Sequence, residues 1–427
     1  MIYCDIHKRM AYKNNFSFVY MQNLLYLCKK YWTMNFTHLH VHSHYSVLDG
    51  MSKVPDLIDK CLRTGMNAIA LTDHGNMYGI KELLDSAKKA NSKLKAKAEE
   101  TGAEYIPFKP IVGIEAYCAR RGRLMQDKDF KITNAEGRTQ IVDMSGWHLI
   151  LLAKNKTGYH NLCKLTSLSF MEDSFYRTAR IDKQLLEECH EGIICCSACL
   201  GGELPQKILS ALNASVDNEE TRFAEAEATI VWFKQLFGED YYIELQRHQT
   251  DKPGGDQRTY QVQKVVNEVL IQLARKHGVK VIATNDVHFV EEEHSEAHDR
   301  LICLSTNHYV DDEDRMHYTK QEWLKSPEEM AAIFADIPEA ISNTQEIVDK
   351  VEVYSIDSGP IMPKFPIPED FGTEETYRQK FTEQELFDEF TRDEHGNVVL
   401  SQEAAEKKAL EKGNRLTSLN LMNFVIN

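Results

Sequence analysis

The sequence contains one dense group of histidines, which reads His38-Leu39-His40-Val41-His42-Ser43-His44. Because side chains alternate along an extended strand, His38, His40 and His42 are predicted to share one side while Leu39 and Val41 pack on the other. Protonated imidazoles crowded on one side would repel one another, so the pattern makes sense when neutral rings share a cation. The stretch therefore predicts a metal site on a strand.

Short apolar runs alternate with amphipathic stretches along the rest of the chain. The apolar runs cover residues 36–41, 68–71, 111–117, 148–153, 192–197, 241–245 and 279–283. The amphipathic stretches include residues 54–64, 81–100, 218–237 and 260–277. Seven β units separated by helices predict a parallel α/β architecture, and the count favours a barrel over an open sheet. The polar residues 120–146 predict an insertion or a long loop, and Ser326 with Pro327 predicts a helix start.

Two further polar clusters follow predicted strands. One reads Thr72-Asp73-His74-Gly75 and the other Asn285-Asp286-Val287-His288. The carboxyl ends of barrel strands are where β/α enzymes place catalytic groups, so both clusters are candidates for the same site. The alternative for Asp73 is a helix N-cap, which needs no function.

Single candidate ligands stand at three other strand boundaries. Glu115 closes an apolar run, where a carboxylate is costly unless it is paired or bound to metal. His148 opens its strand, and plain packing is a fair alternative for it. Cys199 completes a Cys196-x-x-Cys199 spacing, but no second pair exists for a structural zinc knuckle. Imidazole, carboxylate and thiol donors together favour zinc or a mixed site over magnesium.

The composition limits the classes of function. The 427 residues carry a formal net charge of −15, which argues against a protein that holds nucleic acid over a broad surface. No apolar run of 18 residues and no signal-peptide pattern is present, so we expect a cytoplasmic protein without a membrane segment. The ten irregularly spaced cysteines suit free thiols in a reducing compartment.

Taken together, these motifs resemble those of the polymerase-and-histidinol-phosphatase (PHP) superfamily. The surrounding sequence, over roughly residues 34–370, is most similar to the N-terminus of the bacterial DNA polymerase III alpha subunits. The resemblance implies a distorted (β/α)7 barrel of the PHP type, followed by a partial α+β palm segment. It also implies three divalent metal ions, with zinc favoured and manganese or magnesium as alternatives.

The resemblance further implies a set of nine metal ligands. They are His40, His42, Asp49, His74, Glu115, His148, Cys199, Asp286 and His288. In this scheme Glu115 bridges two metals; His40, His42 and Asp286 complete one site, His148 and Cys199 the second, and Asp49, His74 and His288 form the third. Glu115, Asp286, His40 and His42 are the residues expected to act in catalysis. Asp73 is expected to orient a ligand imidazole, while His38 and His44 lie outside the set.

The implied activity is metal-dependent 3′–5′ exonuclease or phosphodiester hydrolysis in DNA replication, within a family of DNA-directed DNA polymerases. The implied partners are the 3′ primer end of DNA and, in a full-length protein, subunits such as the sliding clamp and the proofreading factor. Two alternatives remain: a free-standing phosphatase of the histidinol-phosphatase type, and a non-catalytic domain braced by metal. Arg120, Arg121 and Arg123 could hold phosphates, although a solvated basic loop is the favoured explanation for them.

The resemblance also divides the chain. Residues 1–33 are expected to be a non-native or disordered extension, because Met34 stands where family members begin. Residues 34–330 are expected to form the PHP phosphoesterase domain, and residues 331–427 a linker and the incomplete start of a polymerase palm. The Gly-rich stretch and the Pro-Asp-x-Asp-x-Asp motif of the polymerase site do not occur in the sequence. We therefore expect the polymerase active site to be absent from this chain.

Overall fold

The computed structural model describes most of the chain between residues 36 and 401. The described residues are 36–47, 49–133, 139–214, 221–361, 374–380 and 391–401, with 382, 385, 403, 404 and 407. The predicted extension over residues 1–33 lies outside them. The chain divides into one compact unit that ends at Ile356 and a second that begins at Asp357. The second unit contains helix α13 (Glu374–Lys380), and the assignment of residues 331–427 to a palm stays a prediction.

The first unit is built on a seven-stranded mixed sheet with the order β1-β2-β5-β7-β8-β9, in which β6 also pairs with β2. Its strands are β1 (Ala68–Leu71), β2 (Lys109–Ala119), β5 (Gly146–Ala153), β6 (Arg180–Ile181), β7 (Ile193–Cys196), β8 (Tyr241–Leu245) and β9 (Lys280–Ala283). A separate hairpin joins β3 (Lys131–Thr133) and β4 (Thr139–Ile141) within the predicted insertion.

The strand β5 is the main departure from the predicted parallel order. It runs antiparallel to both β2 and β7, whereas β1–β2, β7–β8 and β8–β9 are parallel pairs. A parallel neighbour requires a crossover, usually a helix, and the described residues between β2 and β5 contain no crossover helix. The chain instead returns through the β3–β4 region and enters β5 in the opposite direction. The α/β fold class and the distorted barrel are confirmed.

The histidine-rich segment over residues 38–42 joins the two edges of this sheet. The backbone N–H of His42 donates to the carbonyl of Val287, beyond β9, at 2.7 Å. On the other edge, the N–H of Thr72 donates to the carbonyl of Val41 at 2.8 Å. The predicted strand over residues 36–41 is therefore irregular, with a single ladder pair at Val41, but it closes the sheet into a ring.

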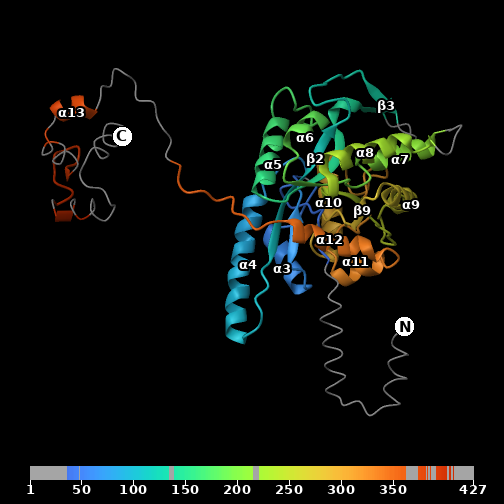
Figure 1. The fold of residues 1–427 in the computed structure, drawn as a ribbon, viewed down its shortest axis with the longest axis horizontal. Helices are drawn as coiled ribbons and strands as arrows, with labels where there is room; N and C mark the ends of the chain where they lie inside the picture. The colour runs from blue at the N-terminus through green and yellow to red at the C-terminus, as the bar shows by residue number, and fades with distance from the viewer. Residues whose placement is uncertain are drawn as a thin grey trace, which may run out of the picture. The chain divides into compact units, whose positions relative to one another are not determined.

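Helices surround the sheet, with α4 and α5 on one side and α7, α8 and α9 on the other (Figure 1). The helices of this unit are α3 (Val54–Arg63), α4 (Ile80–Thr101), α5 (Lys156–Ser169), α6 (Lys183–Cys189), α7 (Glu203–Asn213), α8 (Ala224–Phe237), α9 (Arg258–His277), α10 (Ser295–Thr306), α11 (Pro327–Ile333) and α12 (Pro338–Lys350). The predicted start of α11 is confirmed, because the Ser326 hydroxyl and the Glu329 carboxylate form a reciprocal capping box. Among the described residues, no helix is long and apolar enough to cross a membrane.

Two apolar clusters divide the core. The larger one lies between the sheet and the surrounding helices, while the smaller one gathers side chains from the histidine-rich segment and from every strand of the sheet except β6, including Leu39, Ile111, Tyr242 and Ile282. The smaller cluster therefore fills the interior of the barrel. Ile347 and other α12 residues belong to it, so α12 closes the end of the barrel opposite the carboxyl ends of the parallel strands. The polar clusters are left at the open end.

We predict that this closure contributes substantially to stability. Ile347 is fully buried, so Ile347→Ala should lower the free energy of unfolding by about 2–5 kcal/mol through lost burial and a cavity. The matched control is Val353→Ala, just beyond the same helix, where the side chain is 90% exposed and the change should stay below about 0.5 kcal/mol. Denaturant unfolding measures both. A similar small effect in the two variants would show that α12 is not part of this core.

Candidate metal centre

The nine predicted ligands converge at the open end of the barrel. His40 and His42 come from the segment that closes the ring, His74 follows β1, Cys199 follows β7, and Asp286 and His288 follow β9. Glu115 lies in β2, His148 in β5, and Asp49 in the loop after the histidine segment. The position of His148 at the start of its strand, which the sequence left ambiguous, follows from the direction of β5. Since β5 is antiparallel, its amino end lies at the same rim as the carboxyl ends of its neighbours.

Glu115 lies at the centre of this group and is fully buried. Its Oε1 lies 2.7 Å from His148 Nδ1 and 3.4 Å from His40 Nε2. Its Oε2 contacts His74 Nδ1 and lies 3.9 Å from His42 Nε2. One carboxylate therefore touches four of the candidate imidazoles, which is the arrangement that a bridging ligand requires.

Two aspartates complete the contacts around Glu115. Asp286 Oδ1 lies 3.1 Å from His40 Nε2 and 3.2 Å from His42 Nε2. Asp49 Oδ1 lies 2.8 Å from His288 Nε2 and 3.3 Å from His74 Nε2. Asp286 Oδ1 also lies 3.7 Å from His288 Nδ1, so both aspartates reach His288.

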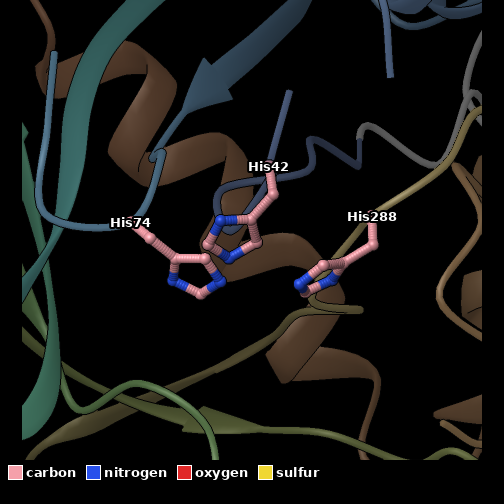
Figure 2. A group of neighbouring side chains, drawn as sticks. All are labelled: His42, His74 and His288. Atoms are coloured by element: carbon pink, nitrogen blue, oxygen red, sulfur yellow. The ribbon is translucent and has the colours of Figure 1, made fainter. Parts of the chain in front are cut away.

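Three groups of side chains offer donor atoms within 4.8 Å of one another. They are His40, His42 and Asp286; Glu115, His148 and Cys199; and His42, His74 and His288. Figure 2 shows the third group, with the three rings directed toward a common space. These groups resemble the predicted division into three sites, except that the third contains His42 in place of Asp49. The full ligand set stays a prediction.

The residues fit bound cations by a second criterion. Five buried polar atoms here have no hydrogen-bond partner: His40 Nε2, His42 Nε2, Asp49 Oδ1, Asp286 Oδ1 and His288 Nε2. Buried polar atoms are nearly always satisfied in folded proteins, so a cluster of exceptions needs an explanation. Divalent cations among these atoms would satisfy them together. The rim can therefore hold metal ions.

The electrostatics of the rim agree with this fit. Burial would raise the pKa of Glu115, but the neighbouring imidazoles of His148 and His74 hold it well below its usual value. Burial would lower the pKa of His148, yet the charges of Glu115 and Cys199 raise it to about 10. Burial, followed by the charge of His74, lowers the pKa of His42 to about 3. Without a metal, protons on the imidazoles must balance the carboxylates, and a bound cation would take over that role.

Asp73 supports His42 through an intervening serine. Its carboxylate accepts from the Ser43 N–H at 2.7 Å and from the Ser46 hydroxyl at 2.7 Å, and the same hydroxyl lies 3.0 Å from His42 Nδ1. The Ser46 contact directs His42 Nε2 toward Glu115 and Asp286. This geometry agrees with the orienting role predicted for Asp73, and Ser46 is the part of it that the sequence analysis missed.

A side-chain anchor holds the turn that carries Asp286. Asp286 has a φ of 47°, a left-handed conformation that is strained for a residue with a side chain. Asn285 fixes this turn, because its amide donates to the carbonyls of Gln321 at 2.9 Å and Trp323 at 2.8 Å. Asn285 was quoted in the motif without a role, and its partners lie too far along the sequence for a local pattern to reveal them.

The tyrosine hydroxyl of Tyr318 also reaches the rim, where it donates to Asp49 Oδ2 at 3.0 Å. No motif in the sequence singled this residue out. Its position leaves Asp49 Oδ1 directed at His74 and His288. Asp49 is thereby fixed through Oδ2, and Oδ1 is left without a hydrogen-bond partner.

The outer histidines of the opening motif are not at the rim. His38 Nε2 lies 2.8 Å from the carbonyl of Lys325, and exposed His44 lies 3.9 Å from Glu82. The predicted common side for His38, His40 and His42 is therefore wrong for His38. The backbone bends at His40, so that Leu39 enters the barrel interior and Val41 the outer core.

The three arginines after β2 are occupied by other contacts. Arg121 Nε donates to Asp143 at 3.0 Å, and Arg123 pairs with Asp182 at 3.0 Å. The guanidinium of Arg120 lies over the ring of Trp147, 3.9 Å from its centre. Two of the three candidate phosphate ligands thus already neutralise carboxylates.

Comparisons with known proteins agree with this geometry. Residues 38–248 match the family model described as the PHP domain. The chain is 41% identical over 349 residues to DNA polymerase III subunit alpha of Borreliella burgdorferi, which covers 81% of this chain and 26% of that protein. It is 36% identical over 359 residues to the subunit of the same name from Treponema pallidum, covering 84% and 27%. The chain therefore spans about a quarter of the length of these curated relatives.

A solved structure of histidinol phosphate phosphatase from Lactococcus lactis, with zinc, L-histidinol and phosphate bound, is also similar. It shares 11% identity, and the match covers 68% of this chain and 99% of that chain with a TM-score of 0.29. That score is below the range in which a shared fold can be argued.

We predict that Glu115→Ala loses more than one metal per chain, because its carboxylate lies against four candidate imidazoles. Cys199→Ser should mainly weaken one site, because Sγ contacts only His148 among the candidates, at 3.6 Å. Elemental analysis of the purified, dialysed proteins measures both, with about three ions expected in the wild type. Equal loss of a single metal in the two variants would contradict the bridging role.

Proposed function

Residues 38–248 are a PHP domain and the chain is related to DNA polymerase III alpha subunits, and from this premise we propose that it hydrolyses phosphodiesters at the 3′ end of DNA with bound metal ions. The activity belongs to DNA replication in the cytoplasm. The observation that carries the proposal is the convergence of nine ligand-type side chains on one rim around Glu115.

The proposed metals are three divalent ions, and zinc suits the mixture of imidazole, carboxylate and thiol donors best. When bound, such ions supply Lewis acidity and offset the charge of a phosphate ester. Manganese and magnesium remain possible substitutes because carboxylates are among the donors. Glu115, Asp286, His40 and His42 form the part of the rim nearest the proposed reaction.

The residues of the chain bind and orient rather than attack. Glu115 and Asp286 fix the imidazoles of His40 and His42, and the buried position of these rings excludes water from behind the site. His74, Asp49 and His148 are partly exposed, and their edge of the rim is where a substrate can enter. The proposal therefore needs no protein nucleophile.

The charge of the protein favours a narrow mode of substrate binding. With a net charge of −15, the body of the molecule repels DNA, and attraction is restricted to the metal rim. A single-stranded or mispaired 3′ end can approach closely spaced metals, whereas a duplex is too wide. We therefore propose a 3′ primer end as the DNA partner. In a longer polymerase subunit, the sliding clamp and a proofreading factor would be further partners.

We predict slow, metal-dependent release of mononucleotides from a 3′-labelled oligonucleotide. Mispaired or single-stranded ends should react faster than paired ends, and added salt should inhibit steeply. His40→Ala and Asp286→Ala should each reduce the rate by at least roughly 100-fold, because they remove metal ligands. The matched control is His44→Ala, four residues from His40 but outside the rim, which should change the rate by less than about twofold.

The outcomes of this assay separate the alternatives. Nuclease activity that survives a chelator would identify a contaminant. Hydrolysis of histidinol phosphate without cleavage of DNA would favour the free-standing phosphatase. Tightly bound metal without hydrolysis of either substrate would leave a domain that metal only braces.

A further inference from the structure

One buried carboxylate beneath the rim is not among the nine predicted ligands. Glu244 in β8 is 2% exposed. Its Oε2 lies 3.0 Å from His40 Nδ1 and accepts from the Thr284 hydroxyl at 2.8 Å, while its Oε1 accepts from the N–H of Ala198 at 3.0 Å. Both oxygens are thus engaged, and neither contacts a second candidate ligand.

The three partners of Glu244 lie on three different ligand-bearing segments. His40 is itself a candidate ligand. Ala198 precedes Cys199 and has a φ of 62°, so its strained turn presents the thiol. Thr284 lies two residues before Asp286, whose turn is also left-handed. One side chain therefore holds the ends of the histidine segment, β7 and β9 against one another.

The backbone of Glu244 is also fixed by its neighbours. The Glu244 N–H donates to the Ser197 hydroxyl at 2.9 Å, and β8 pairs in parallel with β9 so that Glu244 lies opposite Ile282. The position of the carboxylate is therefore set by the sheet itself. It is independent of the exposed loops around the rim.

The negative charge of the Glu244 carboxylate is compensated by an imidazole rather than by a lysine or an arginine. Its recorded ion pair is with His40, and no lysine or arginine contact to it is found among the described residues. A buried carboxylate is costly unless a cation compensates it. A metal on His40 Nε2 would polarise the ring and make the Nδ1–H···O contact a charge-assisted hydrogen bond.

We propose that Glu244 is a positioning residue for the metal centre: it holds the proton of His40 on Nδ1 and so keeps Nε2 free to bind metal between Glu115 and Asp286. The inference rests on the proposed metal-dependent function. It extends that function to a residue that binds no metal and touches no substrate.

The test is a zinc titration of chelator-stripped wild-type protein and Glu244→Gln against a chromophoric competitor. In the variant, the glutamine amide can accept a hydrogen bond from only one of the two N–H donors, Ala198 and His40. If its NH2 group faces His40, the ring must accept on Nδ1 and carry its proton on Nε2. We expect the affinity of one zinc site to fall by about 10–100-fold while the protein stays folded.

Glu203→Gln is the matched control. Glu203 is also a buried glutamate, 7% exposed, but it pairs with Lys183 and Lys207 and contacts no candidate ligand. Its change should leave zinc affinity within about twofold of the wild type, whatever it does to thermal stability. An equal loss of affinity in both variants would reduce Glu244 to a general structural role and overturn the proposal.

A second measurement needs no variant, in case Glu244→Gln does not fold. Nitrogen NMR of the zinc-loaded wild type reports which nitrogen of His40 carries the proton. We expect Nδ1, and a proton on Nε2 would overturn the proposal. If the wild type binds no zinc at all, the proposed function itself fails. If it binds zinc and Glu244→Gln binds it equally well, only the positioning role fails.

Discussion

The burial of the Glu115 carboxylate is the constraint on which the open end of the barrel depends. A charge taken fully out of water is tolerated only with close opposite charge, and Glu115 has no lysine or arginine partner among its described contacts. It has imidazoles instead, which carry positive charge only when protonated or bound to metal. Those imidazoles come from three separate segments, because one strand can direct few side chains to one point: His40 and His42 from the histidine-rich segment, His74 after β1 and His148 in β5. The ring of strands is therefore the means of bringing enough nitrogen donors to one carboxylate.

This demand explains why the barrel is filled differently at its two ends. Below the rim, the interior cluster and α12 form an apolar plug that fixes the strands from within the barrel. At the rim, the same inward-facing positions carry Glu115, His148 and Glu244. In β2 the change from apolar to polar takes four residues, from Ile111 to Glu115, with both side chains facing inward. A stiff apolar layer directly beneath the ligands limits how far they can move apart when no metal is bound.

How much of this could be predicted from the sequence depended on whether the cause was local. The strand over 68–71 and the start of α11 were predicted correctly because periodicity and capping are set by near neighbours. The direction of β5 was not, because antiparallel pairing depends on the missing crossover helix rather than on any residue in the strand. The bend at His40 was missed for a similar reason: hydrogen bonds to both Thr72 and Val287 outweigh the alternation of an isolated strand. Roles for Asn285, Tyr318 and Glu244 could not be assigned, since their partners lie from 36 to 269 positions away along the chain.

The arginines near the rim are engaged in the structure of the segment that follows β2. Arg180 is fully buried, and its guanidinium donates to the carbonyls of Met125, Asp143 and Arg123 rather than to any ligand. It thereby fixes the polar segment after β2 against β6. In the sheet, Tyr117 of β2 pairs with Arg180 on one side and with His148 on the other. Arg121 and Arg123 in the same segment are held by aspartates. Two of the three arginines that the sequence offers for a phosphate therefore help to build this segment instead. With these arginines already neutralised in an acidic protein, cations held by the histidines and carboxylates would be a strong local source of positive potential at the rim.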